Sequence, residues 1–186
     1  GDVVHQASQG VAGAPERADA AATDPWPGVA SAYLVRIDGE VRWAANDAAR
    51  MKPASLTKMM TAVLVVEALA PSSEVVVSKR AATADGVRLG LRSGMRLPVE
   101  HLLAAALLRS ANDACLALAE RVAGSEAVFV ARMNERAAAL GLADTHFANA
   151  CGFDAPDHYA SARDLARLAD AALDKPRIAA IVARES

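Results

Sequence analysis

The stretch Pro53-Ala54-Ser55-Leu56-Thr57-Lys58 leads into a largely apolar run from Met59 to Ala70, which Pro71 closes. The run is apolar on nearly every side, which is typical of a helix buried in a core. Pro53 suits a chain that arrives extended and then turns into a helix. The sequence therefore predicts a buried helix with Ser55 and Lys58 at its N-terminus.

Ser55 and Lys58 have the spacing that brings two side chains onto one face of a helix, where the amine can reach the hydroxyl. A lysine can take a proton from a serine only when burial or nearby positive potential lowers the pKa of its amine. A buried helix and the positive end of its dipole supply both conditions. A single S-x-x-K arises by chance about once in a chain of this size, and serine also caps helices. A second motif is therefore needed.

That second motif is Ser110-Ala111-Asn112. S-x-N and S-x-x-K each occur once in the chain. It lies between two apolar runs, 102–108 and 114–122, that have helical character. Polar residues that interrupt two apolar helices are either a plain connection or part of a site.

Together the motifs resemble the penicillin-binding and serine β-lactamase superfamily, whose elements are S-x-x-K, S-x-N and K-T-G. Four segments resemble the low-molecular-mass, S11-type serine D-alanyl-D-alanine carboxypeptidases within it. The resemblance runs from about Val29 to the last residue and is carried by residues 53–62, 110–115, 141–147 and 161–166.

The resemblance implies a role for each motif residue. Ser55 would be the nucleophile that attacks the D-Ala-D-Ala carbonyl, and Lys58 its general base. Ser110 would relay the proton to the departing D-alanine, and Asn112 would hold the substrate backbone and Lys58. The implied function is a serine peptidase that cleaves peptidoglycan stem peptides through an acyl-enzyme, is inhibited by β-lactams and needs neither cofactor nor metal.

The implied fold is α+β and β-lactamase/transpeptidase-like, here mostly the helical subdomain plus the N-terminal hairpin of the antiparallel sheet. The third motif departs from the pattern, because no Lys-Thr-Gly or Lys-Ser-Gly occurs. In the family it lies on a sheet strand beyond the segment that matches residues 161–164. We therefore expect residues 29–186 to be a partial penicillin-binding domain whose C-terminal sheet strands are missing from this chain. We expect another segment to carry K-T-G, and these residues alone to be weakly active or inactive.

Composition limits the remaining possibilities. The chain is 53% apolar and only 4% aromatic, which favours close-packed helices over a β-sandwich. Its net charge of −2, without a basic stripe, argues against a nucleic-acid partner. Residues 1–28 have no periodic apolar face and are interpreted as a flexible leader or linker that lacks the apolar run of a signal peptide. The resemblance implies a location in the periplasm or on the extracytoplasmic face of the membrane.

Local patterns predict the other elements. Asp38-Gly39 between residues 30–37 and 40–44 indicates a β-hairpin. A short strand is expected at 75–77, and loops or short strands at 89–97. Helices are expected at 99–108, 113–123, 126–140 and 162–173, with Ser125 and Ser161 as caps and Gly141 as a stop.

Two further questions concern cysteine and metal. Cys115 and Cys151 could pair in an oxidising compartment, but we expect Cys115 to be a free, small buried residue on its helix. A metal hypothesis built on His146, Cys151, Asp154 and His158 matches no standard zinc spacing. His146 is expected instead to satisfy a loop.

Other functions stay open. A class A β-lactamase would add an E-x-x-L-N pattern, which no glutamate beyond Ser110 provides, so penicillins are expected to be inhibitors rather than substrates. A glutaminase-type relative also uses S-x-x-K. A non-catalytic module that binds peptidoglycan or a partner protein could retain the scaffold without the chemistry.

Overall fold

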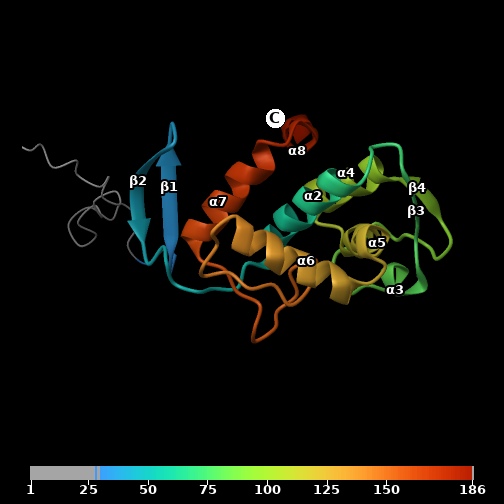
Figure 1. The fold of residues 1–186 in the computed structure, drawn as a ribbon, viewed down its shortest axis with the longest axis horizontal. Helices are drawn as coiled ribbons and strands as arrows, with labels where there is room; N and C mark the ends of the chain where they lie inside the picture. The colour runs from blue at the N-terminus through green and yellow to red at the C-terminus, as the bar shows by residue number, and fades with distance from the viewer. Residues whose placement is uncertain (1–27, 29, 186) are drawn as a thin grey trace, which may run out of the picture. The chain divides into compact units, whose positions relative to one another are not determined.

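The computed structural model describes Gly28 and residues 30–185 (Figure 1). The leader predicted over residues 1–28 therefore lies outside the described residues, apart from Gly28. The chain divides into two compact units, Gly1–Asn46 and Asp47–Ser186. Both candidate motifs belong to the second unit.

The described part of the first unit is a β-hairpin. Strand β1 (Tyr33–Ile37) pairs antiparallel with β2 (Glu40–Ala45). Asp38 and Gly39 both have positive φ, 52° and 80°, as a tight two-residue hairpin turn requires. The Asp-Gly prediction is confirmed.

The second unit consists mainly of helices. A 3₁₀ turn, η1 (Ala54–Leu56), leads directly into α2 (Thr57–Ala68). The later long helices are α4 (Val99–Leu108), α5 (Asn112–Ala123), α6 (Glu126–Ala139) and α7 (Ala162–Leu173). All the predicted helices are thus present. The ends of the four later helices agree to within a residue, whereas α2 ends two residues before the predicted apolar run does.

Helix α2 is central to this unit and contacts α4, α5, α6, α7 and the short α8 (Pro176–Val182) (Figure 1). Its residues 60–65 are all buried, as the apolar run predicts. The largest fully buried side chains around it are Leu102, Leu103, Leu118, Phe129, Met133, Phe147, Leu168 and Ile181. Because α2 is surrounded, residues at its N-terminus are held on a rigid support.

Short elements complete the unit. Strand β3 (Glu74–Val76) lies one residue before the strand predicted at 75–77. It pairs antiparallel with β4 (Arg96–Pro98), which overlaps the end of the region 89–97 expected to hold loops or short strands. Two short helices were not predicted. Helix α3 (Lys79–Ala82) is capped by Ser78, and α8 begins with a proline. A last 3₁₀ turn covers Ala183–Glu185.

The predicted caps are confirmed as well. The Ser125 hydroxyl accepts from the Val128 amide at the start of α6, and the Ser161 hydroxyl accepts from the Asp164 amide at the start of α7. The α+β assignment holds, since helices dominate and both sheets of the described residues are small and antiparallel. None of the described helices has the length and apolar character needed to cross a membrane.

Candidate active site

Ser55 lies in the 3₁₀ turn rather than in α2 itself. The Leu56 amide donates to the Pro53 carbonyl, and the α-helix begins only at Thr57. Ala54 has a φ of +48°, a conformation that alanine rarely adopts. The turn leaves Ser55 exposed, while Lys58 on the following helix is only 4% exposed.

Ser55 and Ser110 meet at this turn. Their hydroxyl oxygens are 2.8 Å apart, and either one can donate to the other. Ser110, two residues before the start of α5, has a φ of +54°. Of the described non-glycine residues with positive φ, Asp38 and Asn46 are types that tolerate this conformation, whereas Ala54 and Ser110 are not. Strained backbone of this kind is concentrated at functional sites.

Lys58, in the first turn of α2, is three residues after Ser55. Its Nζ donates to the backbone carbonyl of Cys151 at 2.7 Å, and no direct hydrogen bond joins it to Ser55 in the described structure. Burial lowers the pKa of the Lys58 amine to about 8. A fraction of the amine is therefore neutral near pH 7. A neutral amine can donate to Cys151 and still keep a lone pair for a proton.

Asn112 begins α5, two residues after Ser110. Its side-chain amide donates to the Asp85 carbonyl at 2.8 Å, and its backbone amide donates to the Val87 carbonyl at the same distance. A Cβ on Gly86 would lie 2.8 Å from Nδ2 of Asn112. The 85–87 segment is thus packed directly against the side chain that begins α5.

The sequence reasoning missed Asp113, which is fully buried. Its carboxylate accepts the backbone amides of Leu89, Gly90 and Leu91 at 3.0–3.1 Å. Asn112 and Asp113 together therefore fasten residues 85–91 beside the site. The only sequence signal was an acidic residue at the start of a helix, which is ordinary for a first turn.

His158 is buried and contacts Thr57, which lies within the S-x-x-K segment. Its Nδ1 accepts the Ala148 amide at 2.9 Å, so Nε2 carries the proton and donates to Thr57 Oγ1, also at 2.9 Å. Burial lowers the pKa of the His158 imidazole. His146 instead contacts the Asp157 carbonyl through Nδ1 and pairs with the Tyr159 backbone, as expected for a loop residue. Among the described residues, no three His, Cys, Asp or Glu side chains gather where they could hold a metal.

The expectation of a free Cys115 is wrong. Cys115 and Cys151 form a disulfide, and their Cα atoms are 6.0 Å apart, a normal separation for such a bond. The loop that follows α6 returns to the side of α5 and brings Cys151 against Cys115. Residue spacing along the chain cannot reveal this contact, because 36 positions separate the two cysteines.

The arrangement can support nucleophilic chemistry. An exposed serine hydroxyl is hydrogen-bonded to a second hydroxyl, and a buried amine of lowered pKa lies one turn along the same segment. An activated serine requires such a base close by. All four predicted site residues lie at or just before the N-termini of α2 and α5, which the contact between Ser55 and Ser110 brings together.

Comparisons with known proteins point to the same family that the sequence motifs resemble. The family model described as D-alanyl-D-alanine carboxypeptidase, Peptidase_S11, matches residues 22–184. The D-alanyl-D-alanine carboxypeptidase DacF of Bacillus subtilis is 40% identical over 145 residues, covering 75% of this chain and 37% of the relative. The chain thus spans little more than a third of the length of such relatives.

Solved structures agree in fold. A D-alanyl-D-alanine carboxypeptidase from Mycobacterium tuberculosis superimposes with a TM-score of 0.79 at 31% identity, covering 87% of this chain and 62% of that one. Penicillin binding protein 5 from Haemophilus influenzae gives a TM-score of 0.78 at 32% identity, covering 86% of this chain and 49% of that one. The chain therefore belongs to the S11 peptidase family, the D-alanyl-D-alanine carboxypeptidases.

Proposed function

We propose that the protein is a serine D-Ala-D-Ala peptidase that cleaves peptidoglycan stem peptides through an acyl-enzyme and is inhibited by β-lactams. One observation carries the proposal. The exposed hydroxyl of Ser55 is 2.8 Å from that of Ser110, beside a buried Lys58 whose pKa is lowered to about 8. Family membership supports the substrate class.

Acylation would follow from these residues. The neutral Lys58 amine takes the Ser55 proton while Oγ bonds to the carbonyl carbon between the two D-alanines. The C–N bond then breaks as Ser110 donates its hydroxyl proton to the departing amine and takes up the proton that Lys58 holds. Water later attacks the ester and releases Ser55, with acid and base roles reversed. The hydrogen bond between the Ser55 and Ser110 hydroxyls supports a role for Ser110 in proton transfer at the Ser55 oxygen.

Two further roles complete the proposal. Asn112 would hold the substrate backbone, and the backbone N–H of Ser55 would donate to the developing oxyanion. The 186 residues contain no Lys-Thr-Gly or Lys-Ser-Gly. We infer that full activity needs a segment carrying that motif, which would supply the second oxyanion N–H and a basic group for the substrate carboxylate.

The substrate implies the location. Peptidoglycan lies outside the cytoplasmic membrane, so the protein would act in the periplasm or at the extracytoplasmic face of that membrane. A disulfide within the site fits an oxidising compartment.

D-alanine release tests the proposal. The full-length protein is incubated with a peptide ending in D-Ala-D-Ala and, separately, with one ending in L-Ala-L-Ala. Free terminal alanine should appear from the first peptide only, and Ser55→Ala should abolish its release. No release by a folded full-length protein would contradict the proposal and favour a binding module. Rapid hydrolysis of penicillin would indicate a β-lactamase instead.

A further inference from the structure

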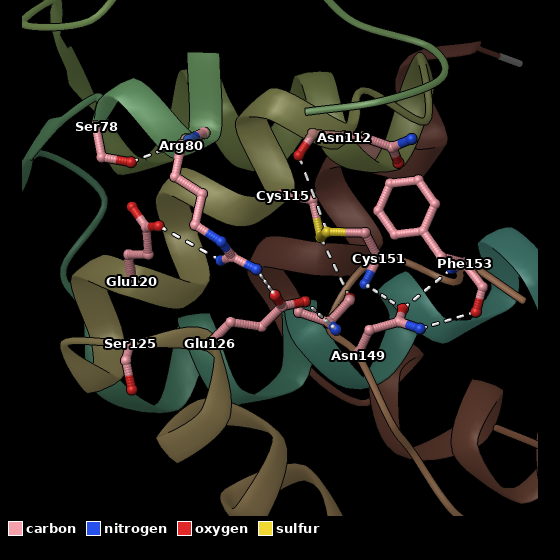
Figure 2. Close-up of polar contacts among 12 residues, drawn as sticks. Ser78, Arg80, Asn112, Cys115, Glu120, Ser125, Glu126, Asn149, Cys151 and Phe153 are labelled. Atoms are coloured by element: carbon pink, nitrogen blue, oxygen red, sulfur yellow. Dashed lines mark hydrogen bonds and ion pairs between the residues drawn. A yellow bond between two sulfur atoms is a disulfide. The ribbon is translucent and has the colours of Figure 1, made fainter. Parts of the chain in front are cut away.

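The loop that supports Lys58, residues 149–153, is folded around one side chain. Oδ1 of Asn149 accepts the backbone amides of Cys151, Gly152 and Phe153 at 2.8–3.2 Å (Figure 2). Its Nδ2 donates to the Phe153 carbonyl at 2.8 Å. The 149–153 loop is therefore a compact unit whose parts move together.

This loop contacts the candidate nucleophile and base directly. The Cys151 carbonyl accepts from Lys58 Nζ, and the Ala150 carbonyl accepts from Thr61 Oγ1 one turn along α2. Gly152 packs so tightly on the turn of Ser55 that a Cβ there would lie 2.0 Å from the Ala54 carbonyl oxygen. A displacement of the loop would therefore move the acceptor of Lys58 and release the Ser55 turn.

The disulfide joins this loop to α5 on the other side of the site. Cys115 lies one turn after Asn112 on α5. The disulfide therefore connects the helix that begins at the S-x-N motif with the 149–153 loop, which contacts the S-x-x-K motif (Figure 2). Both sulfur-bearing residues are buried, at 0% and 3% exposure. Glu126, which is paired with Arg80, accepts the Ala150 amide and anchors the same loop from α6 (Figure 2).

We propose that the Cys115–Cys151 disulfide is a positioning element of the active site, holding the Cys151 carbonyl on the Lys58 amine and so fixing where that amine lies relative to Ser55. The proposal rests on the function proposed above. Reduction adds two electrons and two protons to the sulfur pair and leaves two thiols, while a dithiol reductant becomes a disulfide. Once the bond is gone, nothing covalent fixes the loop relative to α5, and the base loses its orientation. Such misplacement lowers the rate of acylation by about 10- to 100-fold.

The test compares three forms of the full-length protein: oxidised, reduced with dithiothreitol, and Cys115→Ser/Cys151→Ser. Mass mapping without reduction should find residues 115 and 151 linked. Ser55 acylation by labelled penicillin is followed against pH in each folded form. We expect the reduced and double-serine forms to react 10- to 100-fold more slowly, with a shifted pH midpoint, and reoxidation of the wild type to restore both. Dithiothreitol should not change the double-serine form, which is the matched control.

Hydrogen exchange provides a readout independent of activity. Breaking the disulfide should speed amide exchange in residues 149–153 and 54–61, while α7 stays protected. Free thiols in the native protein, or equal acylation rates and pH midpoints in all folded forms, would overturn the inference. If no form is acylated, the proposed function fails, and hydrogen exchange alone tests the positioning role. Faster exchange in residues 54–61 after the disulfide is broken supports that role, and unchanged exchange refutes it. If the double-serine form does not fold, reduction and reoxidation of the wild type supply the same comparison.

Discussion

The hydroxyl oxygens of Ser55 and Ser110 lie 2.8 Å apart although 55 positions separate them in the chain. Ser55 follows Ala54, which has a positive φ, and Ser110 itself has a positive φ. This contact between two side chains on unusual backbone is the geometric basis for the proposed role of Ser110 in proton transfer.

Ser110→Ala should slow acylation of Ser55 without preventing it. The substitution removes the hydroxyl neighbour and leaves Lys58 in place, so the loss should be about 10²-fold, as for one proton-transfer group. Stopped-flow or quenched labelling with a fluorescent penicillin measures the rate. A rate equal to that of the wild type would remove Ser110 from the mechanism.

The acylation rate should depend on the protonation of Lys58. Burial lowers the pKa of this amine to about 8, and only the neutral form can accept a proton. Below pH 8 the neutral fraction of the Lys58 amine rises about tenfold for each unit of pH. The rate should therefore climb from pH 6 to 8 and level off above. A flat profile over this range would show that Lys58 is not the base, and Lys58→Arg should abolish the reaction.

Stability should fall in mild acid because of His158. Burial lowers the pKa of its imidazole, an effect that His146 reinforces and that Asp157 and Asp154 oppose. The unfolded chain then binds this proton more readily than the folded one. The contribution of His158 to stability is complete above its ordinary pKa of about 6.5 and is lost as pH falls through the lowered value.

His158→Gln tests this contribution, because glutamine can still contact Thr57 and does not titrate. Urea unfolding at pH 7.5 and pH 5 should show a smaller loss of unfolding free energy for the variant than for the wild type. Equal losses would mean that His158 does not titrate on unfolding.

Gly152→Ala should damage both stability and reactivity. Its φ is +97°, and the new Cβ would meet the Ala54 carbonyl oxygen at 2.0 Å. Gly94→Ala is the matched control, since Gly94 has a φ of +86° with nothing within 4 Å. The control should cost about 1–2 kcal/mol of unfolding free energy, because alanine is disfavoured at positive φ, and Gly152→Ala should cost clearly more, with slower acylation. Similar costs at both positions would argue against the close packing of Gly152 on Ala54.

The disulfide should also stabilise the folded chain. It closes a loop with a sequence separation of 36, for which loss of unfolded-state entropy predicts about 3–4 kcal/mol. Denaturant unfolding of the wild type against Cys115→Ser/Cys151→Ser measures this difference. A double variant as stable as the wild type would mean that the bond does not form in the native protein.

Sequence patterns predicted the elements that rest on local chemistry. The apolar run after Lys58 indicated the central helix, Ser125 and Ser161 indicated caps, and Asp38-Gly39 indicated the hairpin. The motifs also predicted four site residues, and the structure brings these four to adjoining helix ends.

The rest of the site depends on contacts that leave no local pattern. Lys58 is held by a backbone carbonyl, which any residue at position 151 could supply. His158 suggested a metal from its type alone, yet it contacts Thr57 across 101 positions. The disulfide depends on how the loop after α6 returns to α5, which spacing cannot show.

The site of penicillin attachment tests the central claim most directly. The full-length protein is treated with penicillin and digested with trypsin, and the peptide of residues 51–58 is analysed by mass spectrometry. We predict that this peptide gains the mass of one penicillin on Ser55, and that Ser55→Ala removes the adduct. A folded full-length protein with no adduct, or with the adduct on another residue, would contradict the account.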